Sequence, residues 1–172
     1  SPGGNREVVS PQELIELFDL SRVRKTAAQF DQRKLDWLNG QYLKRLPAAA
    51  LAALLAERLI AKGWLPPTYD RPWLERIAAL LQDRLRVLED IEEEHGFLFQ
   101  EPLVYQPEAV SKFLQQPGVA ERLLELRKRL SQLAAFETSA IETTTRGFMS
   151  EQGLEGKALV HPVRVAITGR AV

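Results

Sequence analysis

The stretch that organises the chain reads Phe30-Asp-Gln-Arg-Lys-Leu-Asp-Trp-Leu-Asn-Gly-Gln-Tyr-Leu43. Asp31 belongs to the residue types that cap helices, and Leu35, Leu38 and Tyr42 recur at three- and four-residue steps. This spacing brings the apolar side chains to one side of a helix. The stretch therefore predicts a helix that buries one face.

The same stretch also carries polar groups with a second possible use. Lys34, Asn39 and Gln41 place donors and amides beside Trp37 and Tyr42, a mixture that suits contact with a folded RNA backbone. A core helix with a solvated flank explains the same residues, and this stretch alone leaves both interpretations open. We expect the two aromatic residues in the core rather than as stacking surfaces.

The composition limits what kind of partner the chain can have. Among its 172 residues, 23 Lys and Arg balance 23 Asp and Glu, so broad charge-driven binding of nucleic acid gains no support. An RNA partner would need local basic clusters, and modest ones occur at Arg22, Arg24 and Lys25, at Lys44 and Arg45, and at Arg127, Lys128 and Arg129. Each cluster is equally compatible with a solvated face.

Other features of the composition point to the cell interior. The chain has no cysteine, which excludes disulfides and thiolate metal sites and is compatible with a reducing cytoplasm. No apolar run approaches the length of a membrane span. We therefore expect a cytoplasmic protein without a membrane partner.

Helical patterns cover most of the remaining chain. A capping box, Ser10-Pro-Gln-Glu13, predicts a short helix from Pro11 to Asp19. By periodicity and by Pro and Gly boundaries we predict further helices from Pro47 to before Gly63, Pro72 to about Glu94, Pro107 to Leu114 and Val119 to Phe136, and one that Thr138 caps and that ends before Gly153. The run 163–167 alternates like a strand, with Pro162 where a helix could begin, so it stays open between strand and helix.

Nothing in the sequence suggests catalysis or a metal site. His95 and His161 have no residues around them at the spacing of an acid-base pair or of metal ligands. The side chains of the acidic run 89–94 would point in several directions on a helix and could not converge on one ion. We therefore expect the run to form a solvated acidic face that repels phosphates. Lys25 and Thr26 follow no glycine-rich phosphate loop. We predict no catalytic residue and no metal ligand.

Two motifs resemble a known family. Phe-Asp-x-x-Lys-Leu-x-Trp-Leu-Asn-Gly-Gln-Tyr-Leu resembles the opening of the anticodon-binding region of bacterial-type glutamyl-tRNA synthetases. Arg146-Gly-Phe148 and His161-Pro-Val-Arg-Val-Ala-Ile-Thr-Gly169 resemble that family's closing motif, in the right order and at a suitable distance. The resemblance extends over essentially the whole chain and implies an all-α fold of two packed helical subdomains, with a helix over 160–168.

The resemblance also implies a division of labour. Residues 1–9 would be a linker from the preceding part of a parent protein, 10–96 a first anticodon-binding subdomain and 97–172 a second, C-terminally incomplete one. The partners would be the tRNA for glutamate and the parent's catalytic domain, within a monomer. This piece lacks the class I synthetase signatures, so ATP and magnesium would belong to the parent's catalytic domain and this piece would need no cofactor.

The family implies roles for particular residues. Arg84 matches the position that faces the third anticodon base, and it lies at the margin of an apolar helix face, from which a guanidinium can reach solvent. Arg146 and Arg164 match basic positions near the first two bases, and Thr168 and Gly169 begin the loop that completes that pocket. Lys34, Asn39 and Gln41 are expected to support the fold and backbone contacts. For each arginine, an ordinary surface ion pair is the alternative.

The sequence also bears on two other functional classes. Amphipathic helices and neutral charge also suit a helical protein-interaction module without an RNA role. An RNA-binding surface should weaken steeply with salt, whereas an apolar docking surface should not. A small stand-alone enzyme is disfavoured, because no acid-base cluster is present.

Overall fold

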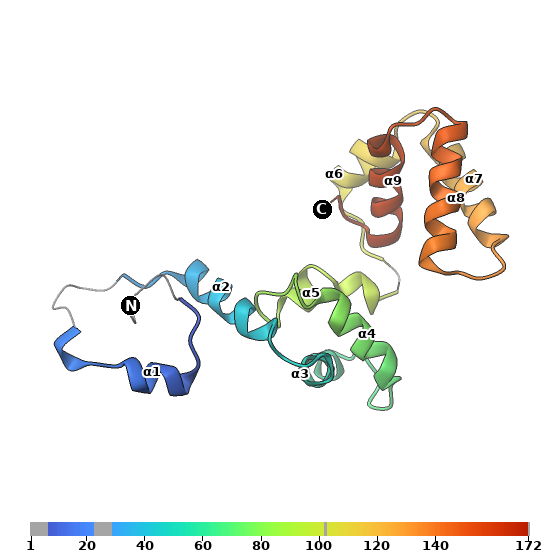
Figure 1. Cartoon of the computed structure of the whole chain (residues 1–172). Helices are drawn as coiled ribbons and strands as arrows, with labels where there is room; N and C mark the ends of the chain where they lie inside the picture. Colours follow the sequence, from blue (N-terminus) through green and yellow to red (C-terminus); the bar gives the residue numbers. More distant parts are fainter. Residues whose placement is uncertain (1–6, 23–28, 102, 172) are drawn as a thin grey trace. The chain divides into compact units, whose positions relative to one another are not determined.

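The structure is a computed structural model that describes residues 7–22, 29–101 and 103–171. Every regular element in these ranges is helical, which confirms the predicted all-α fold (Figure 1). The main helices are α1 Pro11–Leu17, α2 Gln32–Leu43, α3 Ala48–Ala61, α4 Arg71–Leu81, α5 Asp90–Glu93, α6 Pro107–Ala109, α7 Val119–Ser131, α8 Thr138–Glu151 and α9 Gly156–Thr168. Short turns of 3-10 helix cover Leu20–Arg22 and Gly96–Leu98, and a π-turn, Val110–Leu114, continues α6.

Parts of two predicted segments lie outside the described residues. These are most of the predicted linker 1–9 and the basic connector with Arg24 and Lys25. The chain divides into two compact units, a first unit at 1–96 and a second unit at 97–172. The assignment of anticodon-binding subdomains to these ranges stays a prediction.

The predicted caps at the start of the first unit are confirmed. The Ser10 hydroxyl accepts a hydrogen bond from the backbone N–H of Glu13 at 3.2 Å, and the Glu13 carboxylate accepts one from the N–H of Ser10 at 2.8 Å. The Asp31 carboxylate accepts from the N–H of Lys34 at 3.2 Å. These bonds satisfy donors that a helix start leaves unpaired, which is why both starts could be predicted from local sequence.

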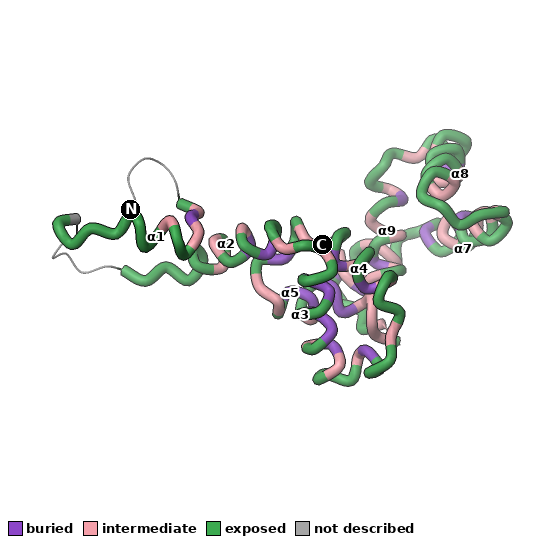
Figure 2. The backbone as a smooth tube through the Cα atoms, turned by 60° about the horizontal axis from the view of Figure 1, so that its bottom comes forward, coloured by how far each residue is buried: buried purple, intermediate pink, exposed green. Residues whose placement is uncertain are grey.

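The core of the first unit lies between α3 and α4. Its deeply buried side chains come from α3, from α4, from the turn that follows α4 and from α5: Leu51, Leu55, Leu59, Leu74, Ala78, Leu81, Leu85 and Ile91. Figure 2 shows the buried positions recurring along α3. Leu54 of the same helix is exposed.

The long helix predicted from Pro72 to Glu94 is wrong, because α4 ends at Leu81. Two side chains hold the chain in a different path. The Asp90 carboxylate accepts from the backbone N–H groups of Arg86 and Val87 at 2.7 and 3.1 Å, and the Gln82 amide donates to the carbonyl of Leu46 at 2.6 Å. Such side-chain bonds compete with helical backbone bonds. Leu74, Ala78, Leu81 and Leu85, at three- and four-residue steps along this segment, are buried all the same.

The second unit packs α8 and α9 against α7. Leu126, Phe148 and Leu159, one from each helix, form its buried core. Two predicted boundaries in this unit were wrong: α7 ends at Ser131 rather than near Phe136, and the N-cap of α8 is Glu137 rather than Thr138.

The alternating segment 163–167 is part of helix α9, as the resemblance implied. Pro162 lies inside this helix rather than at its start. A proline has no N–H to donate to the carbonyl four residues earlier, here that of Ala158. The Arg122 guanidinium donates to that carbonyl at 3.4 Å, so a side chain from α7 supplies the missing donor.

Candidate nucleic-acid interface

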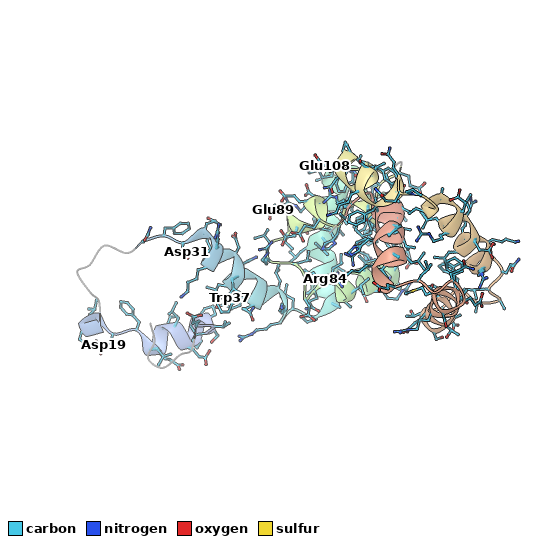
Figure 3. All side chains as sticks on the ribbon, turned by 90° about the horizontal axis from the view of Figure 1, so that it is seen from above. Asp19, Asp31, Trp37, Arg84, Glu89 and Glu108 are labelled. Carbon is cyan, nitrogen blue, oxygen red and sulfur yellow. The ribbon has the colours of Figure 1, made fainter. Side chains whose placement is uncertain are left out.

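Arg84 lies on the turn after α4, where its side chain is exposed (Figure 3). Its backbone N–H donates to the carbonyl of Leu81 at 2.7 Å, and the flanking Leu81 and Leu85 are buried. Within the ranges the structure describes, its guanidinium has no ion pair or hydrogen bond. Arg84 is exposed beside buried leucines, as expected, but it lies on a turn rather than on the predicted helix face, and no surface ion pair is observed for it in these ranges.

Helix α2 holds the turn that carries Arg84. The Asn39 amide donates to the carbonyl of Arg86 at 2.7 Å, and Gly40 faces the same backbone. A Cβ at Gly40 would lie 3.2 Å from the Arg86 Cα and 3.2 Å from the Leu85 carbonyl oxygen. Gly40 thus allows the close backbone approach that a glycine inside a helix suggests.

The C-terminal end of α2 makes further bonds to this region. Gln82 donates to the carbonyl of Leu43 at 3.0 Å as well as to Leu46, and Lys44 lies 3.6 Å from the Asp83 carboxylate. Gln82 and Asp90, which position this turn, could not be predicted from the sequence, because periodicity does not reveal their hydrogen-bond partners.

The acidic run after this turn is only in part the solvated face that we expected, because Glu89, Glu93 and Glu94 are exposed but Asp90 and Glu92 are not. Asp90 is buried, and the side chain of Glu92 is only 12% exposed. Arg58 pairs with Glu89 at 2.9 Å and also with Glu92, and Lys62 pairs with Glu92 at 2.7 Å. The hydrogen bond from Lys62, and then that from Arg58, lower the pKa of Glu92 below its ordinary value.

These pairs change the expected electrostatics. Glu89 and Glu92 face cations of α3, and Glu94 lies 3.5 Å from Arg86. Neighbouring cations match part of the charge of this run, which weakens the expected repulsion of phosphates.

Arg146 and Arg164 are both exposed, on α8 and α9. Arg146 pairs with Glu142 one turn earlier at 2.8 Å, and Arg164 donates to the carbonyl of Ala171 at 3.4 Å. An exposed pair of this kind is worth only about 0.3–0.5 kcal/mol. A ligand could recruit Arg146 at little cost.

Thr168 and Gly169 form the end of α9. The Thr168 hydroxyl donates to the carbonyl of Arg164 at 2.8 Å, and the Gly169 N–H donates to the carbonyl of Val165 at 2.8 Å. The Gly169 carbonyl accepts from the N–H of Gln106 at 2.9 Å. The polar groups of these two residues therefore already bond within the protein, at the end of α9.

Two of the three residues predicted as RNA contacts on α2 bond to other parts of the protein. Lys34 pairs with Glu7 at 2.8 Å, and the hydrogen bond that Lys34 donates to the Glu7 carboxylate raises the pKa of Lys34. Gln41 is half-buried, and Asn39 bonds the backbone of Arg86. Lys34 and Asn39 thus make intramolecular contacts, in line with the support role expected for them.

The expectation that Trp37 and Tyr42 lie in the core is wrong, because both are exposed (Figure 3 labels Trp37). The Tyr42 hydroxyl donates to the carbonyl of Val9. The buried positions of α2 are Gly40 and Leu43, so its buried face is narrower than the leucine spacing indicates.

One basic cluster of the second unit serves the fold. Arg129 pairs with Glu125 at 3.1 Å and Glu151 at 2.7 Å, and its guanidinium lies 5.0 Å from the centre of the Phe148 ring. Arg127 of the same cluster is exposed and borders an apolar groove of about 660 Å³ between α7 and α9. The lining of this groove is leucine-rich, so it offers few groups that could read a base edge.

The described ranges meet neither the requirements of a metal site nor those of a membrane span. Those residues contain no group of three or more His, Asp or Glu able to hold an ion. His161 stacks on Phe113 with ring centres 5.1 Å apart. Across the same part of the chain, no helix is both long and apolar enough to cross a membrane.

Comparison with known proteins agrees with the resemblance seen in the motifs. The model of a family described as an anticodon binding domain matches residues 40–172, so the chain belongs to this family of anticodon-binding domains. It is 34% identical over 175 residues to a glutamate–tRNA ligase of Moorella thermoacetica, a match that covers 100% of this chain and 36% of the relative. It is 35% identical over 172 residues to glutamate–tRNA ligase 2 of Koribacter versatilis, again covering 100% and 36%.

Solved structures give the same result. The crystal structure of a glutamate tRNA ligase from Elizabethkingia meningosepticum superimposes with a TM-score of 0.84 at 27% identity, covering 100% of this chain and 33% of that one. The chain thus spans about a third of the length of these relatives.

Proposed function

We propose that this chain recognises the anticodon of the tRNA for glutamate, as part of a longer glutamate–tRNA ligase. Family membership and full-length matches to such ligases support the proposal. Joining glutamate to the tRNA, with ATP and magnesium, belongs to a catalytic domain outside residues 1–172. We place the parent in the cytoplasm and expect it to act as a monomer.

The observation that supports the proposal most strongly is the exposure of Arg84 on a fixed turn. It is an exposed cation with no ion pair in the described ranges, on a turn fixed by Asn39, Gln82 and Asp90. A pre-positioned guanidinium can stack on an unpaired base or donate to its edge, and such a contact is worth about 1–3 kcal/mol. We assign Arg84 to the third anticodon base.

The second unit would serve the other two bases. Arg146 and Arg164 are exposed and reach solvent at little cost. Thr168 and Gly169 would hold the end of α9 in place beside Arg164. Lys34, Asn39 and Gln41 would support the first unit and contacts to the RNA backbone.

The test is to titrate the chain with a glutamate tRNA transcript and with its third-base variants, using Arg84→Ala and a control. The control is Arg76→Ala, which removes an exposed cation from α4 and changes the net charge equally. We expect Arg84→Ala to lose about 1–3 kcal/mol of binding free energy for the transcript with the natural anticodon, which corresponds to roughly 5- to 150-fold weaker binding.

The pattern across transcripts decides the outcome. Arg84→Ala should bind the natural transcript and the third-base variants alike, whereas Arg76→Ala should keep the preference of the unchanged chain. If Arg84→Ala keeps the full third-base preference, or both substitutions weaken every transcript equally, the assignment of Arg84 is wrong.

A further inference from the structure

Asp83 places an exposed carboxylate directly beside Arg84 on the turn after α4. Its side chain is 88% exposed. Within the part of the chain that the structure describes, the carboxylate makes no hydrogen bond, and its one ion pair is with Lys44 at 3.6 Å. An ion pair between exposed groups is weak, so the Asp83 carboxylate can take another partner at little cost.

The backbone that carries Asp83 and Arg84 is fixed on both sides. Before it, the Gln82 amide donates to the carbonyl of Leu46 at 2.6 Å, and after it Leu85 is buried. Consecutive Cα atoms lie only about 3.8 Å apart, so both side chains start from neighbouring points of one fixed turn. Two groups that bond one base need not converge on a point, as the ligands of an ion must, because the edge of a base spreads its donors and acceptors along its length.

RNA bound at Arg84 would bring Asp83 close to the same nucleotide. A carboxylate repels phosphates, and it loses free energy if it gives up water without gaining a hydrogen bond. It avoids that loss by accepting a hydrogen bond from an amino group of the base. The alternative is a carboxylate that stays solvated, and such a group would oppose the binding of any RNA.

The two functional groups fit the edge of one base better than the others. A carboxylate only accepts hydrogen bonds, and a guanidinium only donates them. The pairing edge of cytosine carries an amino donor followed by two acceptors, so Asp83 can accept from the amino group while Arg84 donates beside it. Uracil has a carbonyl in place of that amino group, and guanine reverses the order of donors and acceptors. In the same arrangement, either base would turn a carbonyl oxygen towards the Asp83 carboxylate.

We propose that Asp83 is a second residue that reads the third anticodon base, and that its carboxylate accepts a hydrogen bond from the amino group of cytosine beside Arg84. This inference rests on the proposed function, because it takes the third anticodon base as the ligand of Arg84. It agrees with the genetic code, in which the glutamate codons begin with G, so that the third anticodon base of a glutamate tRNA is cytosine.

The experiment measures the affinity of the 172-residue chain for glutamate tRNA transcripts that carry cytosine, uracil or guanine as the third anticodon base. Asp83→Asn keeps the size of the side chain but adds an NH₂ group, which can donate to the uracil carbonyl. We expect the preference for cytosine over uracil to fall roughly tenfold in this variant. The control Glu75→Gln removes an exposed carboxylate of α4, changes the net charge equally and should keep the preference.

A solvated carboxylate predicts a different pattern. Asp83→Asn and Glu75→Gln would then both strengthen the binding of every transcript and keep the preference for cytosine, because each removes a charge that repels phosphates. That pattern overturns the proposal, as does any result in which Asp83→Asn keeps the full preference. Lys44→Met should also keep the preference, and its loss in that variant would overturn the base contact by showing that Asp83 acts through Lys44.

The same measurements separate this inference from the proposed function. If the unchanged chain binds transcripts with every third base alike, the proposed function and the role of Asp83 both fail. A preference for cytosine that is lost in Arg84→Ala but kept in Asp83→Asn leaves the proposed function intact and removes only the role of Asp83. Loss of the preference in both variants, with the Glu75→Gln control unchanged, supports both.

Discussion

At residue 169 the backbone passes too close to its neighbour for any side chain. Gly169 has φ +75, and a Cβ there would lie 2.2 Å from the Val104 carbonyl oxygen. Gly153 has a similar φ of +61 but no atom within 4 Å of the same position. Alanine substitutions at the two glycines therefore separate the free-energy cost of the left-handed backbone from that of the close contact.

Gly169→Ala should lower the free energy of unfolding more than Gly153→Ala does. The left-handed conformation costs a non-glycine residue about 1–2 kcal/mol in both variants. Overpacking against Val104 adds about 1–3 kcal/mol for Gly169→Ala alone. Urea unfolding of both variants measures the difference, and equal losses would show that the 104–106 segment yields freely.

Arg122 holds parts of the second unit together by donating hydrogen bonds to three backbone carbonyls. Its guanidinium donates to Gly118 at 2.8 Å, to Pro117 at 3.1 Å and to Ala158 at 3.4 Å. Arg122→Met keeps much of the apolar stem but removes these donors, so we expect a loss of about 1–3 kcal/mol in unfolding free energy. Arg127→Met, which removes an exposed cation of α7, is the control and should change stability by less than about 0.5 kcal/mol.

At the scale of the elements, the sequence predicted what local chemistry determines. The starts of α1 and α2 follow from Ser10 and Asp31, because each cap bonds within three residues of itself. The end of α4 could not be predicted in this way. It depends on Gln82, whose amide reaches Leu46, 36 residues away, and periodicity carries no record of such a bond.

The same bonds make Asn39 a positioning residue for Arg84. Asn39→Ala removes the hydrogen bond to the Arg86 carbonyl and should cost about 0.5–1.5 kcal/mol of stability. It should also reduce the third-base preference although Arg84 is unchanged. Binding to the anticodon variants is the measurement, and a preference that survives intact would show that the turn holds its shape without α2.

Glu92 should make the first unit sensitive to acid. Its pKa is lowered from the ordinary value of 4.5, chiefly by Lys62 and then by Arg58. A carboxylate with a lowered folded pKa contributes stability that is present above about pH 4.5 and is lost as the pH falls through the lowered value.

Glu92→Gln should therefore lower stability at pH 7 and flatten the loss of stability on acidification. Urea unfolding at pH 7 and in steps below pH 4.5 measures this. The control is Glu57→Gln, an exposed carboxylate of α3, which should keep the acid dependence of the unchanged chain. A similar acid profile for Glu92→Gln and the unchanged chain would contradict the role of Lys62 and Arg58.

At the scale of the whole molecule, the family was evident from two motifs, but the use of their residues was not. The motif over 161–169 predicted a helix correctly because the resemblance outweighed the strand-like alternation. It could not show that Thr168 and Gly169 bond within the protein, since those partners come from tertiary structure. The exposure of the Trp37 and Tyr42 side chains could not be predicted for the same reason.

Salt dependence separates the RNA-binding account from a protein-interaction module. The chain has no net charge, so any attraction to RNA must come from a few exposed cations. Affinity for the tRNA should fall steeply as salt rises, with a slope of about −0.7 per phosphate contact on a log-log plot for single-stranded regions. A flat dependence would favour an apolar docking surface.

The most direct test compares the affinity of the chain for a glutamate tRNA transcript with its affinity for the same transcript in which all three anticodon bases are replaced. Three base contacts of about 1–3 kcal/mol each predict binding weaker by well over tenfold for the replaced transcript at equal salt. Equal affinity for the two transcripts would contradict anticodon recognition by this chain.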